Sequence, residues 1–185
     1  MAEGRLATSK IYGDRCQVII TYRGIAPKID DSVFVAEGAQ IIGDVEIGSD
    51  SSVWFNAVVR GDVHHIRIAE RTNIQDNAVL HVSHERHPLH IGSDVTIGHG
   101  AIVHACTIRN GCLIGMGAKI LDDAVVGPYA IVAAGALVLE DFIVPEGMLV
   151  AGVPARLRRP LTDLEKDRII QSARNYVGYA KTYRE

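Results

Sequence analysis

Aliphatic residues recur along this chain at every sixth position, with few interruptions. The repeat skips three residues after Val59, breaks over a polar stretch after Leu80, and is one residue short after Val103. The position four residues after each repeat residue is usually small or β-branched, and glycine often follows the repeat residue directly. The repeat residues are Ile29, Val35, Ile41, Ile47, Val53, Val59, Ile68, Ile74, Leu80, Ile91, Ile97, Val103, Ile108, Ile114, Ile120, Val126, Val132, Val138, Val144 and Val150.

A six-residue period fits neither regular secondary structure on its own. An α-helix repeats every 3.6 residues and a plain strand every two, so neither keeps every sixth residue on one face. A parallel β-helix does, because each hexad forms one short strand and one turn, and three hexads close a triangular coil. Successive coils stack at about 4.7–4.9 Å. The repeat therefore predicts an all-β fold, a parallel β-helix of between six and seven coils.

The extent of the repeat divides the single predicted domain into three segments. Residues 1–28 are expected to form an N-terminal arm and a first strand, placed at the sequence ITYRG. Residues 29–155 are expected to form the β-helix. In residues 156–185, Pro160 breaks the preceding element, Thr162 and Glu165 make a capping box, and apolar residues follow at helical spacing. We therefore expect one C-terminal helix over about residues 162–183, packed along the prism.

Composition narrows the possible functions. The chain has 185 residues, a net charge of -3, 48% hydrophobic residues and only 5% aromatics, which suits one domain with a narrow aliphatic interior. This charge does not favour a nucleic-acid surface, and the sequence shows no signal-peptide or membrane-spanning pattern. The cysteines, Cys16, Cys106 and Cys112, form no CxxC pair and predict buried thiols in a reducing compartment. We expect a cytoplasmic protein that binds neither nucleic acid nor membrane.

Counting hexads assigns the repeat residues to three faces of the prism. Face A carries Val59, Leu80 and Val103, face B carries Ile68 and Ile91, and face C carries Ile74 and Ile97. The outward residues that follow on face A form one row: Arg60, His81 and His104. His81 and His104 are one coil apart, so their Cα atoms should lie about 5 Å from each other. This separation suits two ligands of one metal ion.

A third histidine, His99, follows Ile97 on face C, around a corner from His104. Asp76 has the equivalent place one coil earlier. One chain is therefore not expected to close a three-histidine site. If three prisms pack around a threefold axis, face A of one can meet face C of the next, so that His99 joins the neighbour's His81 and His104. Three imidazoles and a water are the ligand set of a catalytic zinc, which lowers the pKa of that water to about 7.

These motifs resemble those of the γ-class carbonic anhydrases, which are left-handed β-helix trimers. The likeness spans roughly residues 20–183 and implies a left-handed parallel β-helix of hexapeptide repeats with a C-terminal α-helix. It also implies a homotrimer that binds Zn2+, or Fe2+ or Co2+, and hydrates CO2 reversibly to bicarbonate through a metal-bound hydroxide. The matching motifs are VRGD with Arg60 and Asp62, NIQDNAVLH with Gln75, Asp76 and His81, and IGHGAIVH with His99 and His104.

The resemblance further implies roles for residues around the metal. His81, His99 and His104 would be its ligands. Arg60 and Asp62 would pair across the subunit interface. The remaining pair, Gln75 and Asp76, would orient the metal-bound hydroxide and the incoming CO2.

The chain departs from the family pattern at the positions of the proton shuttles. Val63 stands where the best-known active member has an acidic residue, and His84 stands in a shorter loop in place of a glutamate. His84 is the candidate shuttle here, because an imidazole titrates near neutral pH. The other histidines are expected to be solvated loop residues: His64, His65, His87 and His90.

Three alternative functions stay open. The chain could be a trimeric metal-binding scaffold with weak or no CO2 hydration, or it could hydrolyse another small substrate, such as a thioester, with the same zinc hydroxide. An acyltransferase is less favoured. Hexapeptide acyltransferases use a single histidine as a base and have no three-histidine metal set.

Overall fold

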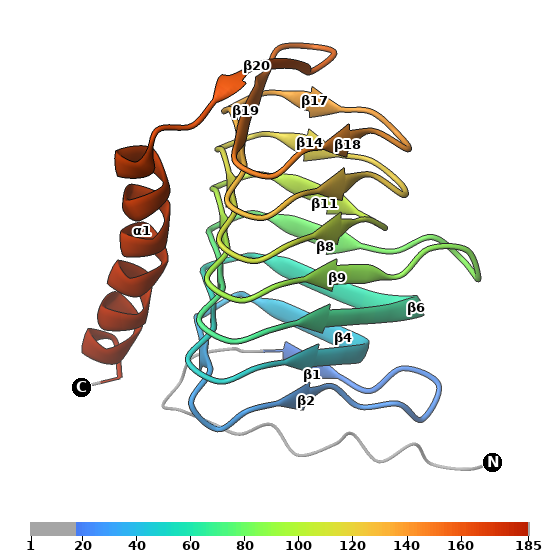
Figure 1. Ribbon diagram of the computed structural model, residues 1–185. Helices are drawn as coiled ribbons and strands as arrows, with labels where there is room; N and C mark the ends of the chain where they lie inside the picture. Colours follow the sequence, from blue (N-terminus) through green and yellow to red (C-terminus); the bar gives the residue numbers. More distant parts are fainter. Residues whose placement is uncertain (1–17, 185) are drawn as a thin grey trace, which may run out of the picture.

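Short strands separated by tight turns make up most of the chain. The computed structural model describes residues 18–184 and is a left-handed parallel β-helix of about seven turns, with one helix along its side (Figure 1). The fold predicted from the six-residue repeat is therefore confirmed. The strand expected at ITYRG lies earlier in the chain: the first described strand is Val18–Ile20, and Tyr22 bridges to Ile25 within a turn. The rest of the predicted arm and Cys16 lie outside the described residues.

Two faces of the prism form one continuous sheet, because two long strands run from face A onto face B without interruption. The strands that span the corner are β4 (Gln40–Ile47) and β6 (Val58–Ile68). Face A also contains β1 (Val18–Ile20), β8 (Val79–His81), β11 (Ile102–His104), β14 (Lys119–Ile120) and β17 (Leu137–Val138). Face B also contains β2 (Lys28–Ile29), β9 (Leu89–Ile91), β12 (Thr107–Ile108), β15 (Val125–Val126) and β18 (Ile143–Val144).

Face C is a separate sheet of parallel strands that ends in one antiparallel strand. Its strands are β3 (Phe34–Val35), β5 (Ser52–Val53), β7 (Asn73–Ile74), β10 (Thr96–Ile97), β13 (Leu113–Ile114), β16 (Ile131–Val132), β19 (Met148–Ala151) and β20 (Arg156–Pro160). β20 pairs antiparallel with β19, so the chain turns back at the last coil. The repeat gave no sign of this strand, since its residues lie beyond the last hexad.

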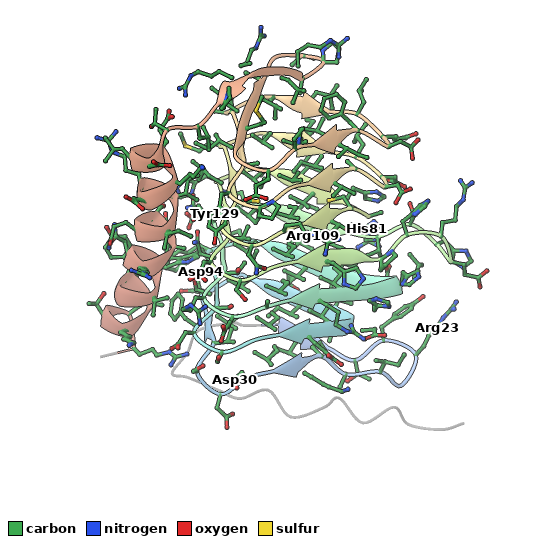
Figure 2. All side chains as sticks on the ribbon, viewed as in Figure 1. Arg23, Asp30, His81, Asp94, Arg109 and Tyr129 are labelled. Atoms are coloured by element: carbon green, nitrogen blue, oxygen red, sulfur yellow. The ribbon has the colours of Figure 1, made fainter. Side chains whose placement is uncertain are left out.

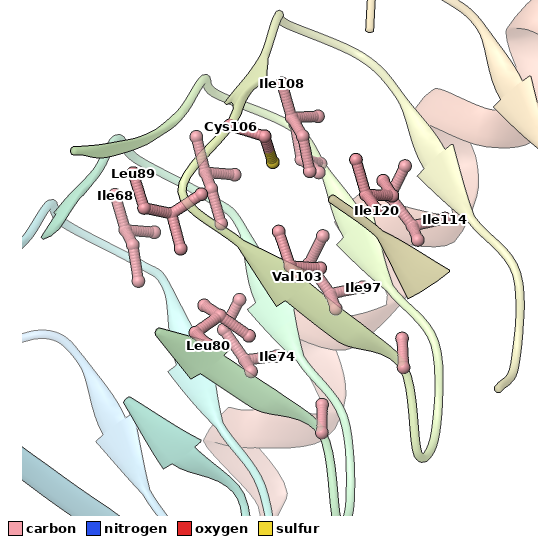
Figure 3. Close-up of a cluster of buried hydrophobic side chains, with 14 of the residues drawn as sticks. Ile68, Ile74, Leu80, Leu89, Ile97, Val103, Cys106, Ile108, Ile114 and Ile120 are labelled. Carbon is pink, nitrogen blue, oxygen red and sulfur yellow. The ribbon is translucent and has the colours of Figure 1, made fainter. Parts of the chain in front are cut away.

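Repeat residues from all three faces meet inside the prism as continuous stacks (Figure 3). Ile97, Ile114 and Ile120 are fully buried, and alanines fill the corners beside them. Burying a branched side chain of this size contributes about 1.5–3 kcal/mol, so the stacks are the main source of stability. The fourth residue after each repeat residue was expected to point inward, which after Val103 would be Thr107. Because this hexad is one residue short, the buried residue is Cys106 instead.

One helix, α1 (Asp163–Thr182), covers face C. The capping box predicted at its start is present, because Thr162 and Glu165 each accept from the other's backbone N–H. The helix turns Ile169 and Ala173 inward and contacts β5, β7 and β10. Near its end, Tyr176 packs edge-on against Trp54 at a centroid distance of 5.3 Å. Among the described residues, no helix has the length and apolar character needed to cross a membrane.

Candidate metal centre

Two of the three predicted metal ligands face each other on face A. β8 and β11 pair in parallel with His81 opposite His104, as the hexad count predicted. Nδ1 of His81 lies 3.1 Å from Nε2 of His104. Two nitrogens bound tetrahedrally to one zinc at 2.0–2.1 Å would lie about 3.3–3.4 Å apart. The pair is therefore close to the spacing that a shared metal ion requires, and Figure 2 shows His81 on the side of the prism away from α1.

A carboxylate stands behind each of these two rings. Oδ1 of Asp62 lies 3.0 Å from Nε2 of His81, and Asp122 forms a short hydrogen bond with Nδ1 of His104. Each ionised carboxylate can only accept a hydrogen bond, so the ring nitrogen that faces it carries the N–H, which assigns the tautomer of each ring. Both inner nitrogens are then left with a lone pair aimed at the other. Such an arrangement is stabilised by a cation between the rings.

Burial and hydrogen bonding set the protonation of this row. Burial lowers the pKa of His81, and the hydrogen bond to Asp62 opposes that shift only in part. Burial raises the pKa of Asp62, but hydrogen bonds with His81 and Arg60 outweigh it and leave a net lowering. A neutral imidazole beside an ionised carboxylate is the protonation state that binds a divalent metal.

Close packing of two glycines fixes the position of Asp62. A Cβ on Gly43 would lie 2.4 Å from the carbonyl oxygen of Gly61, and a Cβ on Gly61 would lie 2.6 Å from that of Asp44. Only glycines allow β4 and β6 to approach this closely at the corner between faces A and B. Arg60 and Asp62, on either side of Gly61, form an ion pair within the chain. The pairing across a subunit interface implied by the resemblance stays a prediction.

The third predicted ligand, His99, lies in the turn between β10 and β11, at the corner of faces C and A. Oδ2 of Asp76 is 2.6 Å from its Nδ1, and the side chain of Gln75, which is 5% exposed, accepts from its backbone N–H. Residues 18–184 contain no group of three His, Cys, Asp or Glu side chains that could hold a metal within one chain. A role of His99 in a neighbour's site stays a prediction.

One detail of the predicted assembly needs correction. Face C was expected to meet face A of the next subunit, but α1 covers the strands of face C next to His99. The corner that carries His99 remains accessible, with the side chain 45% exposed. A neighbour would therefore have to meet this corner and not the flat of face C.

Comparison with known proteins identifies the family. The model of the bacterial transferase hexapeptide family (six repeats) matches residues 105–140. Gamma carbonic anhydrase 2, mitochondrial, of Arabidopsis thaliana is 45% identical over 85% of this chain, which spans 59% of that relative's length. A carbonic anhydrase of Geobacillus kaustophilus is 42% identical, over 90% of this chain and 91% of its own. The chain belongs to the γ-class carbonic anhydrase family.

A solved structure agrees with this assignment of the fold. The hexapeptide transferase family protein of Anaplasma phagocytophilum has a TM-score of 0.86 and 43% identity, over 90% of this chain and 98% of its own. Some relatives are named carbonic anhydrases and others transferases, so the names alone do not decide the activity of this chain, and its own residues must. In this γ-class chain, those residues are the row on face A and the corner at His99.

Two of the remaining histidines lie in the loop where they were expected, and three lie in strands instead. His84 is in the loop between β8 and β9, with its side chain 67% exposed and its ring 3.9 Å from Glu85. A role as proton shuttle therefore has geometric support only from its access to solvent. His64, His65 and His90 are strand residues, not loop residues, and their rings contact one another on face B. Of the four histidines expected in loops, His87 alone lies in one, the loop that also contains His84.

Sequence reasoning missed one residue of the site, Asp122. It contacts the outer nitrogen of His104 and also the hydroxyl of Ser83. Burial raises the pKa of Asp122, but hydrogen bonds from Ser83 and His104 outweigh this effect, so the net shift of the pKa is downward. The signal was its place one coil after His104: Ile120 pairs with Val103, so Asp122 comes one residue after the position that would stack on His104.

Proposed function

We propose that this chain is a zinc-dependent carbonic anhydrase that hydrates CO2 at metal sites between the subunits of a homotrimer. The observation that carries the proposal is the pair of facing nitrogens on His81 and His104, each backed by a carboxylate. Nitrogen ligands at tetrahedral spacing favour Zn2+, and imidazole also suits Fe2+ and Co2+. The family names of the relatives agree with this chemistry.

A bound zinc ion would supply hydroxide at neutral pH by lowering the pKa of a bound water to about 7. The residues of the chain would do the rest. His81 and His104 would hold the ion, with Asp62 and Asp122 fixing the tautomer of each ring. Asp76 would orient His99 in the same way for the neighbouring site. The net reaction converts CO2 and water to bicarbonate and a proton that leaves to solvent.

Exposed apolar residues on face A support an assembly. Val79 and Ile102 are paired in register beside the histidine row, and both are more than a third exposed. Leu139 lies further along the same face, and Met116, one coil beyond His99 at the corner, is 59% exposed. Burying such a patch against a second copy favours association. A closed ring of three copies would give every site the same surroundings.

Metal analysis and stopped-flow CO2 hydration test the activity. Zinc-loaded protein should hydrate CO2 faster than buffer at neutral pH, and His104→Ala should lose both the metal and the rate. His90→Ala is the matched control, since this strand histidine on face B contacts no predicted ligand. Bound zinc without a rate at any pH, with reductant present, would leave a metal-binding scaffold or a hydrolase of another substrate. Purified protein that never binds metal would point to the acyltransferase reading.

Mixed trimers test the shared site. His99→Ala and His81→Ala chains should each fail to bind zinc alone. Unfolded together in equal amounts and refolded, they should regain about a quarter of the sites, because random assembly pairs an intact His81–His104 row with an intact His99 in about one interface in four. No recovery in refolded trimers would show that one chain supplies all three ligands.

A further inference from the structure

One carboxylate links a predicted metal ligand to the loop that joins β8 to β9. Nδ1 of His104 donates to Oδ1 of Asp122, and the hydroxyl of Ser83 donates to Oδ2 of the same side chain. Ser83 belongs to residues 82–88, here called the 82–88 loop, which joins β8 to β9. Asp122 comes from a turn in the next coil. Three segments that are distant in sequence therefore meet at one side chain.

We infer that Asp122 couples the 82–88 loop to His104, so that loop position and metal affinity depend on each other. The inference rests on the proposed role of His104 as a metal ligand. A carboxylate behind a ligating histidine holds the ring in place and makes its far nitrogen more basic. Ser83 holds that carboxylate from the loop side. When the loop moves away, Asp122 loses a donor and is free to rotate off His104.

Partial burial makes this link more than a surface contact. The side chains of His104 and Asp122 are only 30% and 29% exposed, so water does not fully compete for their hydrogen bond. Val82, the first residue of the loop, is buried in the core and holds the loop's base against the prism. The coupling is also reciprocal: a metal that fixes His104 and Asp122 must stabilise the docked loop by the same factor.

The structure supplies its own control. His87, near the far end of the 82–88 loop, lies 3.5 Å from Asp123, the residue next to Asp122. This second contact also ties the loop to the turn, but Asp123 contacts no predicted ligand among the described residues. Asp123 has a left-handed backbone conformation, with φ of 57°, which asparagine tolerates well. Asp123→Asn therefore changes the loop contact without touching His104.

Zinc affinity is measured by competition with a chelator on the full-length protein. Asp122→Ala should weaken zinc binding about 10- to 100-fold, as other losses of a carboxylate behind a ligating histidine do. Ser83→Ala should weaken it by a smaller factor although Ser83 touches no ligand, and Asp122→Asn, which keeps an acceptor for His104, should lie between wild type and Asp122→Ala. Asp123→Asn should bind zinc as wild type does.

Hydrogen exchange gives a readout that does not depend on activity. Zinc should slow exchange of the amides of residues 84–87 in wild type and have no effect on them in Ser83→Ala or Asp122→Ala. Wild-type affinity in Ser83→Ala, or loop exchange that ignores zinc in wild type, would overturn the coupling. Equal weakening by Asp123→Asn would also overturn it, because any loop contact would then suffice. Zinc-bound protein that shows the coupling but does not hydrate CO2 would overturn the proposed function alone.

Discussion

The coils from Ile108 to Val150 and the coils from Ile41 to Val103 follow the same repeat but differ at one corner. In the later coils every repeat residue follows the last by six positions. In the earlier coils the step from face A to face B takes nine residues after Val59, eleven after Leu80 and five after Val103. The other two corners of these coils keep the regular spacing. The irregularities are thus confined to the corner farthest from α1 (Figure 1).

The difference shows how a repetitive scaffold accommodates a site. Arg60, His81 and His104 are the outward residues immediately before these three irregular steps. The irregular steps after Val59 and Leu80 contain Asp62 and Ser83, and the short step after Val103 lets Asp122, from the next and regular coil, reach His104. The regular coils supply stability through uniform aliphatic stacks, and the irregular corner supplies chemistry. Substitutions in the two regions should therefore have separable effects.

The largest effect should come from the regular coils. Ile114 is fully buried in the stack of face C, so Ile114→Ala should lower the free energy of unfolding by about 2–5 kcal/mol. Zinc affinity should not change, because the cavity lies inside the prism and touches no residue of the row. Denaturant unfolding and chelator competition measure the two quantities. Ile143→Ala, at an isoleucine of β18 that is 67% exposed on face B, is the control for side-chain size and should cost far less.

A matched pair of glycines gives the next effect. A Cβ on Gly61 would lie 2.6 Å from the carbonyl oxygen of Asp44, and a Cβ on Gly127 would lie 2.7 Å from the backbone nitrogen of Glu146. Alanine at either position forces the backbone apart and should cost about 1–3 kcal/mol of stability.

Only Gly61→Ala should weaken zinc binding, because Gly61 precedes the carboxylate that holds His81, while Gly127 lies in a regular coil at the corner of faces B and C. Stability and zinc affinity are measured on both variants. Equal zinc affinity in the two variants would show that the corner tolerates distortion. It would contradict the claim that the irregular corner, and not the regular coils, determines zinc binding.

Most of the fold could be predicted because the interior of the prism admits only one kind of residue at each repeat position. The same count placed His81 opposite His104, since one residue of slippage would turn both side chains inward. The separation of His99 from them also followed from the count. The pairing of His81 with His104 and the separate position of His99 depend only on the number of residues between them, because each hexad contributes one strand.

The features that the count missed depend on packing between segments. Asp122 reaches His104 only because the hexad between them is short and Ala105 takes a left-handed conformation with φ of 44°. The covering of face C depends on where α1 docks, which the helical stripe with Ile169 does not specify. The strand positions of His64 and His65 arise because β6 runs through the corner as one extended segment.

The smallest effect should come from the start of α1, the helix that covers face C. Hydrogen bonds from Arg159 and Thr162 lower the pKa of Glu165 from its usual 4.5 to about 2. A carboxyl whose pKa is lower in the folded chain adds stability above pH 4.5, and this contribution is lost as the pH falls towards 2. The stability difference between wild type and Glu165→Gln should shrink over that range in denaturant titrations. The pair with Arg159 is on the surface, so the effect is small, and Arg159→Gln should reduce the same pH dependence. A difference that stays constant between pH 5 and pH 2 would mean that Glu165 acts through its shape and not through its charge.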